Sequence, residues 1–152
     1  VIEVRGDNVF QGYLNMPEKT REELRDTGFF ITGDLGIQSA DGRISIVGRQ
    51  KDLIISGGYN IYPKEIEDVI NDVDGVLESA VFGVPHPDFG ESVLAAVVLE
   101  KNATINGDAI AAKIAPMLAR FKQPRRYIMV DALPRNTMGK VQKNVLREQF
   151  CD

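Results

Sequence analysis

Two apolar segments in the middle of the chain limit its possible folds more than any other feature. Residues 77–84 and 93–99 are rich in Val and Ala, and Pro85-His86-Pro87-Asp88 lies between them. Continuous β-branched runs of this length are typical of strands that are buried on both faces, and the Pro and Asp residues favour a turn. The sequence therefore predicts two buried strands separated by a turn.

Helical patterns surround these strands. Pro63 suits the first position of a helix whose apolar residues recur at helical spacing until Gly75 ends it. We expect Asp108 to cap a second helix, and Pro116 to kink it or end it early. The expected buried positions of these helices are Ile66, Val69, Ile70 and Val73 in the first, and Ile110, Ile114, Met117 and Leu118 in the second.

Further elements complete this part of the chain. Residues 53–55 predict a brief strand before the turn Ser56-Gly57-Gly58, residues 126–130 a third longer strand, and residues 141–150 a closing helix. Strands and helices in this order indicate the α+β class. We expect a three-stranded sheet with helices, plus a short β-hairpin.

The first 50 residues differ in pattern. Short strands are expected at 1–4, 8–13, 29–32 and 43–47, and one short helix has Pro17 near its start. This segment has too few apolar residues to bury a core by itself. We therefore expect residues 1–50 to be the β-rich tail of a larger domain and residues 51–152 to form a small C-terminal domain.

Composition excludes several classes of function. No apolar run approaches the roughly 18 residues that span a bilayer, and no signal peptide is recognisable, so we expect a soluble cytoplasmic protein without membrane contact. Cys151 is the only cysteine and His86 the only histidine. A disulfide, a metal site and a Ser-His-Asp triad encoded wholly by this chain are thus not expected. The net charge of −4 argues against nucleic-acid binding.

Basic residues are nevertheless concentrated near the C-terminal end. Residues 120–147 contain eight basic side chains and one acidic side chain, Asp131. Such a concentration is typical either of a solvated surface or of a site that attracts a polyanion, such as a phosphorylated small molecule. The basic residues are Arg120, Lys122, Arg125, Arg126, Arg135, Lys140, Lys143 and Arg147.

A few residues are candidates for chemistry. Lys140 follows Gly139 on an expected loop immediately before the last helix, where a cation could reach another domain's active site. Asp34 follows an expected strand and is either a turn residue or a carboxylate that accepts two ribose hydroxyls. Gly57 and Gly58 mark a tight turn or leave room for a ligand beside the backbone.

These segments, taken in order, resemble the AMP-forming acyl-CoA synthetases of the adenylate-forming superfamily over essentially the whole chain. The resemblance rests on GDNVFQGY at 6–13, FFITGD at 29–34, GRQKD at 48–52, IISGGYNIYP at 54–63, EIE at 65–67, GVPHP at 83–87, FKQP at 121–124 and PRNTMGK at 134–140.

This resemblance implies a two-step ligase that uses ATP, Mg²⁺ and coenzyme A. A carboxylate attacks the α-phosphorus of ATP and releases pyrophosphate, and the thiol of coenzyme A then displaces AMP from the acyl-adenylate. In such enzymes a large N-terminal domain contains most of the ATP and acid pocket. A small C-terminal domain, here residues 51–152, rotates as a mobile lid between the two steps.

Roles follow by position from the resemblance. Asp34 and Arg49 would bind the ribose or phosphates of ATP or AMP, Lys51 would be the hinge, and Lys140 would be the catalytic cation of adenylation. Lys140 also resembles a lysine that an acetyltransferase silences in related enzymes. The implied coenzyme A residues are Gly57, Gly58, Phe89, Phe121, Lys122 and Arg125, although Phe89 and Phe121 could equally serve packing alone.

The acid is less defined by these motifs. Within the family the chain looks most like malonyl-CoA synthetases, which implies malonate or methylmalonate; another short-chain, fatty or aromatic acid is the alternative. A carrier-loading adenylation domain and a non-catalytic module that binds coenzyme A or a partner are further possibilities. The family's glycine- and threonine-rich phosphate loop is absent, so we expect the isolated chain to be inactive.

Overall fold

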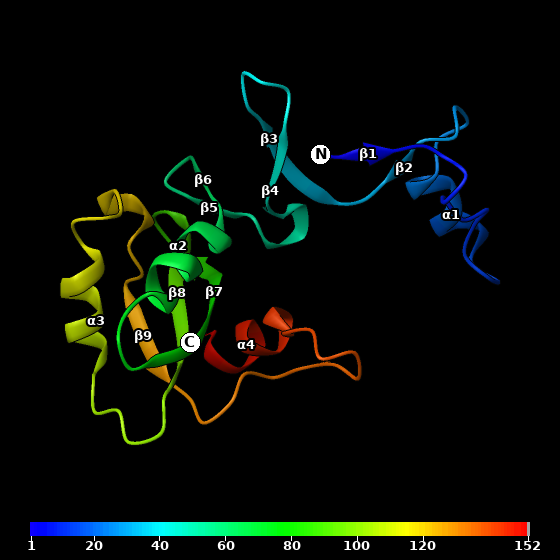
Figure 1. The fold of residues 1–152 in the computed structure, drawn as a ribbon. Coiled ribbons are helices and arrows are strands. Elements are labelled where there is room, and N and C mark those ends of the chain that lie inside the picture. The colour runs from blue at the N-terminus through cyan, green and yellow to red at the C-terminus, as the bar shows by residue number, and fades with distance from the viewer. Residues whose placement is uncertain (152) are drawn as a thin grey trace. The chain divides into compact units, whose positions relative to one another are not determined.

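The computed structural model describes residues 1–151, which form two compact units, Val1–Lys51 and the residues from Asp52 onward (Figure 1). The first unit contains two small antiparallel ribbons and one helix, and none of its side chains is buried. Its elements are β1 (Glu3–Val4) paired with β2 (Phe30–Ile31), β3 (Asp34–Gln38) paired with β4 (Ile44–Arg49), and α1 (Pro17–Glu23). The 3₁₀ helix Gln50–Asp52 crosses the boundary between the two units.

One sequence prediction for this unit was wrong, and one strand was not predicted. Residues 8–13 form a turn, bends and irregular backbone instead of a strand: the Val9 amide donates to the Gly6 carbonyl, and the Tyr13 amide donates to the Thr20 hydroxyl. The strand β3 was missed although the turn at residues 41–42, which was predicted, requires a partner on its N-terminal side. The Phe10 ring packs edge-on against Phe30, so side-chain contacts replace the expected strand pairing.

The second unit is built on a five-stranded sheet. The strands β7 (Val76–His86) and β8 (Gly90–Leu99) form a long antiparallel hairpin. Its turn at residues 87–89 overlaps the predicted turn at 85–88, but Pro85 and His86 belong to β7, where they pair with Glu91 and Gly90. On the other side of β8, β9 (Arg126–Met129) pairs in parallel and β5 (Ile54–Ser56) pairs at Ser56 and Gly90. β6 (Tyr59–Ile61) pairs with β5, so the expected short hairpin is part of the sheet rather than an addition to it.

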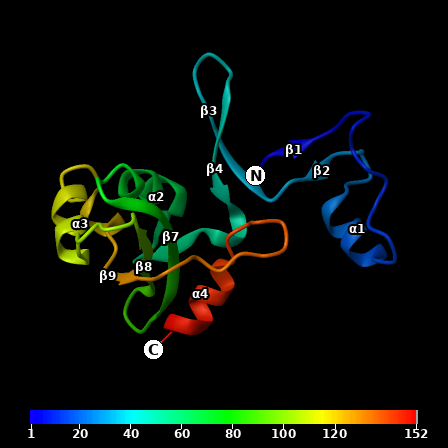
Figure 2. The same cartoon turned by 60° about the horizontal axis from the view of Figure 1, so that its bottom comes forward.

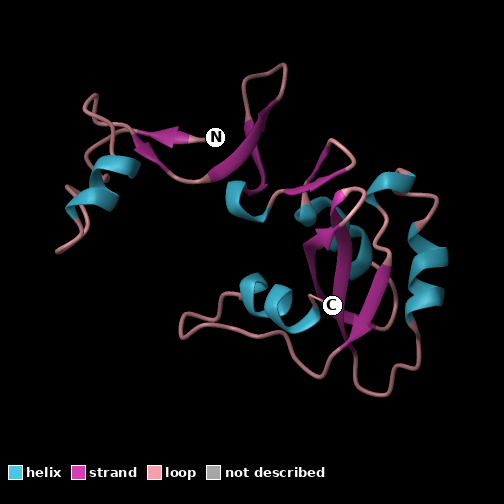
Figure 3. Ribbon diagram, turned by 180° about the vertical axis from the view of Figure 1, so that it is seen from behind, coloured by secondary structure: helices cyan, strands magenta, loops and turns pink. Residues whose placement is uncertain are grey.

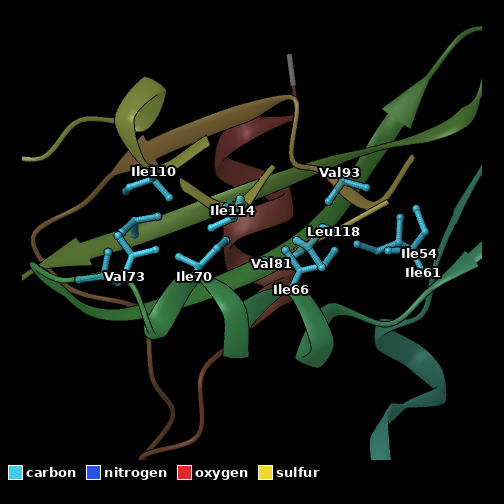
Figure 4. Packing of buried hydrophobic residues seen from close by; sticks show 13 residues of the cluster. Ile54, Ile61, Ile66, Ile70, Val73, Val81, Val93, Ile110, Ile114 and Leu118 are labelled. Carbon is cyan, nitrogen blue, oxygen red and sulfur yellow. The ribbon is translucent and has the colours of Figure 1, made fainter. Parts of the chain in front are cut away.

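Helices cover both faces of this sheet (Figure 2). The helices α2 (Pro63–Asn71) and α3 (Gly107–Ile114) pack on one face, and α4 (Lys143–Phe150) packs on the other. Alternate residues of β7 and β8 belong to the two cores, which is why both strands are apolar along their length. Figure 4 shows the α2 and α3 side, where the fully buried Ile66, Ile70, Ile110 and Ile114 belong to one cluster with the sheet residues Val81 and Val93.

The predictions for α3 and α4 need correction in detail. Asn106, not Asp108, caps α3, because its Oδ1 accepts the Ala109 amide at 2.9 Å. The helix ends at Ile114, which confirms the early break before Pro116. Leu118 still reaches the core, but Met117 is 57% exposed since the chain has left the helix. α4 begins at Lys143, after the loop shown in Figure 3, rather than at residue 141.

Glu67 connects three elements of this unit. One of its carboxylate oxygens accepts the Val81 amide of the edge strand β7 at 2.8 Å, and it lies 2.6 Å from Lys143 at the start of α4. Both side chains of the ion pair are mostly buried, at 13% and 15% exposed. The carboxylate thus satisfies a strand-edge amide and neutralises a cation that would otherwise be buried alone.

Tyr127 is the contrasting case in the described part of the chain. Its hydroxyl is buried without a hydrogen-bond partner, and burial raises the pKa of Tyr127 to about 12. The ring packs on the α3 side of the core, next to Gly107, where a β-carbon would lie only 2.8 Å from the Tyr127 β-carbon. Close packing therefore accounts for the position of this tyrosine and for the glycine beside it.

We predict that Glu67→Ala lowers the free energy of unfolding of the chain by about 2–4 kcal/mol, because it leaves Lys143 and the Val81 amide without partners. Urea denaturation followed by circular dichroism measures this. Glu65→Ala in the same helix removes a more exposed ion pair with Lys122 and should cost under about 1 kcal/mol. Equal losses in the two variants would contradict the role assigned to Glu67.

Candidate functional site: two clefts and an exposed loop

A cleft of about 980 Å³ lies within the first unit. Two groups of side chains line it, one from α1 and the segment before it, and one from the strand ends around Asp34 and Arg49. The lining includes Tyr13, Lys19, Glu23, Phe30, Thr32, Gly33, Asp34, Arg49, Gln50 and Lys51. Three of the predicted site residues, Asp34, Arg49 and Lys51, therefore meet in one cleft.

Asp34 and Arg49 face one another across the β3–β4 ribbon. They are directly paired in its register, and Nε of Arg49 lies 2.7 Å from Oδ1 of Asp34. The Thr32 hydroxyl accepts the Asp34 amide at 3.0 Å, which fixes the start of β3. A half-buried carboxylate can accept hydrogen bonds from two hydroxyl groups, and the guanidinium beside it can bind an anion.

The opposite part of this lining was not singled out from the sequence. The Tyr13 hydroxyl donates to Glu23 at 2.5 Å, and this hydrogen bond raises the pKa of Tyr13. The Lys19 ammonium lies 4.4 Å from the centre of the Tyr13 ring. Residues 11–13 and the helix after Pro17 were visible as a pattern, but only the fold brings Tyr13, Lys19 and Glu23 to the cleft.

A second cleft of about 780 Å³ lies within the second unit. It contains four of the six residues proposed from sequence for coenzyme A, namely Gly57, Phe89, Phe121 and Arg125. The Arg125 guanidinium lies over the Phe89 ring at 4.4 Å, and the Phe121 ring stacks on Tyr59 with centroids 4.4 Å apart. Aromatic faces next to cationic side chains suit a flat heterocycle that bears phosphates.

Gly57 and Gly58 form the turn between β5 and β6. Their φ angles are 57° and 81°, so both lie in the left-handed region that a two-residue hairpin of this type requires. Gly57 lines the cleft, and its amide donates to the Phe89 carbonyl at 2.8 Å. Gly58 does not line the cleft, and no atom lies within 4 Å of the position of an added β-carbon.

The basic segment 120–147 is not simply a solvated surface. At least four of its eight cations pair with carboxylates of the preceding part of the unit: Lys122 with Glu65, Arg135 with Glu78, Lys143 with Glu67 and Arg147 with Asp52. Lys122 is thereby held outside the lining of the second cleft. Arg120, which was not among the predicted ligand residues, and Arg125 line that cleft instead.

Lys140 lies in neither cleft. It is exposed, on the loop between β9 and α4 that extends away from the sheet as a long hairpin (Figure 3). Gly139 before it has a φ of 77°, which makes the turn possible. Among residues 1–151 no group of His, Cys, Asp or Glu side chains could hold a metal ion, and no helix there is long and apolar enough to span a bilayer.

Comparison with known proteins identifies the family. The model of the AMP-binding enzyme C-terminal domain matches residues 65–140, from α2 to the exposed loop. The chain belongs to this family. The segment between the two ends of the match contains the long β7–β8 hairpin, α3 and β9, so the matched part of the family's domain lies within the second unit.

Relatives of this AMP-binding domain include several acid–CoA ligases. The chain is 47% identical, over 96% of its length, to a ligase of Rhodococcus jostii named 3-[(3aS,4S,7aS)-7a-methyl-1,5-dioxo-octahydro-1H-inden-4-yl]propanoyl:CoA ligase. It is 44% identical, over 97% of its length, to the long-chain-fatty-acid–CoA ligase FadD13 of Mycobacterium tuberculosis. The chain spans 28% and 29% of the length of these two proteins.

A solved structure resembles the chain still more. ATP-bound MatB from Rhodopseudomonas palustris is 59% identical to it and superposes with a TM-score of 0.90. The match covers 99% of this chain and 30% of MatB. The chain therefore corresponds to the C-terminal portion of longer enzymes of this family.

Proposed function

We propose that this chain is the C-terminal part of an ATP-dependent acid–CoA ligase that forms an acyl-adenylate and then an acyl-CoA. The observation that supports this most is the 59% identity with ATP-bound MatB over nearly the whole chain. The partner of the chain is then the N-terminal domain of the same ligase. That domain supplies the phosphate loop and the acid pocket, and Mg²⁺ enters with the nucleotide.

In the first step, the carboxylate of the acid attacks the α-phosphorus of ATP and the bond to pyrophosphate breaks. The ribose hydroxyls donate to the carboxylate of Asp34, and Arg49 contacts the ribose or the phosphates. The ammonium of Lys140 lies against the α-phosphate and the attacking carboxylate. It offsets the repulsion between these two anions and the negative charge that develops in the transition state.

In the second step, the thiol of coenzyme A attacks the acyl carbon and AMP leaves. The pantetheine arm passes Gly57 and Gly58, where the hairpin has no side chains. Phe89 and Phe121 contact the adenine of coenzyme A, and Arg125 binds the phosphates of coenzyme A. The second cleft supports this assignment, because it combines these aromatic rings and cations; we add Tyr59 and Arg120 to the set, and Lys122 must leave Glu65 to join it.

Different faces of the domain serve the two steps, so the domain must rotate between them. Lys51 is our proposed hinge. It is exposed within the short 3₁₀ helix Gln50–Asp52, where the first compact unit ends. A short exposed connection is suited to changes in backbone torsion because few packing contacts oppose them.

We propose malonate or methylmalonate as the acid. MatB is a malonyl-CoA synthetase, and it is more similar to this chain than are the two ligases for a bicyclic propanoate and for long-chain fatty acids. Those two still share 44–47% identity with the chain, so this region does not itself select the acid. Another short-chain, fatty or aromatic acid is the alternative, and a carrier-bound thiol could replace coenzyme A.

Lys140 is also a proposed site of regulation by a lysine acetyltransferase. Its side chain is exposed on a projecting loop, where a modifying enzyme can reach it. Acetylation removes the positive charge that adenylation requires. The modified enzyme would still be able to convert a supplied acyl-adenylate to the thioester.

Product analysis tests the proposed function. The full-length ligase, given ATP, Mg²⁺ and coenzyme A, should form malonyl-CoA or methylmalonyl-CoA faster than the coenzyme A ester of hexanoate, palmitate or ferulate. Chromatography of the products measures this. The chain of residues 1–152 alone is the control and should form none, because it lacks the phosphate loop. A preference for palmitate or ferulate would reject the acid that we propose.

Lys140→Ala in the full-length ligase should slow ATP–pyrophosphate exchange by at least about a hundredfold, because the transition-state charge loses its cation. Thioester formation from supplied acyl-adenylate should remain near the wild-type rate. Lys113→Ala, an exposed lysine of α3, is the matched control and should leave both rates unchanged. Equal loss in both steps for Lys140→Ala would reject the division of labour.

Gly58→Leu should do the reverse and slow thioester formation by about tenfold, as a misfitting side chain narrows the passage. Gly42→Leu controls for backbone strain, because Gly42 has a φ of 86° and, like Gly58, no atom within 4 Å of an added β-carbon. The rate of thioester formation of each variant is measured with supplied acyl-adenylate. A loss as large in Gly42→Leu would attribute the effect to strain and not to the passage.

A further inference from the structure

The loop that carries Lys140 is organised by the side chain of Asn136. Its Oδ1 accepts two backbone amides, that of Met138 at 3.0 Å and that of Lys140 at 2.9 Å. The Asn136 amide donates to the Lys140 carbonyl at 2.9 Å, and the Gly139 amide donates to the Asn136 carbonyl at the same distance. The backbone of Lys140 is therefore bonded to Asn136 at both its amide and its carbonyl.

Arg135 connects this turn to the sheet. One of its guanidinium nitrogens donates to the Gly139 carbonyl at 2.7 Å, and another forms an ion pair with Glu78 on β7. Glu78 is half-buried and belongs to the long central hairpin, so it offers a fixed point. The peptide group immediately before Lys140 is thus held through a single arginine to the most extensively paired part of the fold.

The two ends of the loop are closed as well. Arg135 and Val141 form an isolated antiparallel bridge, and the Gln142 amide donates to the Pro134 carbonyl at 2.8 Å. Lys143, next along the chain, is held by the buried ion pair with Glu67. The loop is exposed to solvent, yet backbone hydrogen bonds recur along it from Pro134 to Gln142.

This arrangement answers a physical requirement of the role proposed for Lys140. A lysine side chain has four rotatable bonds and loses about 2 kcal/mol of conformational entropy when it is fixed. A loop free to move would add the cost of ordering its backbone at the moment of reaction. Hydrogen bonds already formed in the resting domain remove that second cost, and a misplacement of about 1 Å can lower a rate by about a hundredfold.

We propose that Asn136 and Arg135 are positioning residues that fix the backbone from which Lys140 extends, and that adenylation depends on them through Lys140. This inference rests on the adenylation role proposed for Lys140. Neither side chain needs to touch the substrates: Oδ1 of Asn136 already accepts the two amides, and Arg135 is bonded to Glu78 and the Gly139 carbonyl.

The test uses the full-length ligase with Asn136→Ala. We expect kcat for ATP–pyrophosphate exchange to fall by about tenfold to a hundredfold with KM for ATP within about twofold, because substrates bind normally while the cation is misplaced. The amide protons of Met138 and Lys140 should exchange with solvent about tenfold faster. Thioester formation from supplied acyl-adenylate should stay at the wild-type rate, which also shows that the variant is folded.

Two further variants sharpen the result. Asn136→Thr keeps a hydroxyl that can accept the amide two residues on, and should recover part of kcat and of the Met138 protection. Asn144→Ala is the matched control, since Asn144 is exposed on α4 and its side chain makes no hydrogen bond with the described residues. It should change neither the rates of the two half-reactions nor the hydrogen exchange of the Met138 and Lys140 amides.

The outcomes separate this inference from the proposed function. If Lys140→Ala abolishes ATP–pyrophosphate exchange while Asn136→Ala leaves kcat for it unchanged, Asn136 does not position the lysine. The inference then fails, while the proposed role of Lys140 stands. A rise in KM at constant kcat in Asn136→Ala would also overturn it. If Lys140→Ala itself leaves exchange unchanged, the proposed role of Lys140 fails, whatever the Asn136 variants do.

Discussion

The pairing of β7 with β8 is the interaction on which the second unit depends. These strands are joined over ten register pairs from Val76 with Leu99 to His86 with Gly90, and both of their faces are buried. A sheet buried on both faces requires a layer of helix on each side. α2 and α3 supply one layer and α4 the other, so the positions of the second cleft and of the exposed loop follow from this hairpin.

Charge adds a second level of organisation. The basic segment near the C-terminal end is matched by carboxylates from residues 52–78, through Asp52, Glu65, Glu67 and Glu78. Glu67 and Glu78 both serve the neighbourhood of the exposed loop, one at Lys143 and one at Arg135. Among residues 1–151 no carboxylate forms an ion pair with Lys140, and this agrees with the proposal that its ammonium binds a substrate.

Motifs with a fixed local geometry were predictable from the sequence. Gly57 and Gly58 were recognised as a turn because few other residues adopt positive φ in succession, and the end of α3 was expected from Pro116. The prediction of a strand at residues 8–13 was wrong, and β3 was not predicted. Short strands depend on partner strands that a local sequence pattern does not reveal. Asn106 replaced Asp108 as the cap for a related reason: either residue can cap a helix, and the surrounding chain decides which one does.

The sequence by itself determined the family, the α+β class, the buried central strands and the candidate residues, since each depends on residue type, order and spacing. Only the tertiary structure decided which candidates lie together. It pairs Asp34 with Arg49, and it places Tyr59 and Arg120 in the second cleft. It also pairs Lys122 with Glu65. The loop of Lys140 is held by hydrogen bonds that join Asn136 to the Lys140 backbone and Arg135 to the Gly139 carbonyl. Most of these contacts link polar side chains that are half-buried or exposed, and no hydrophobic periodicity marks their partners.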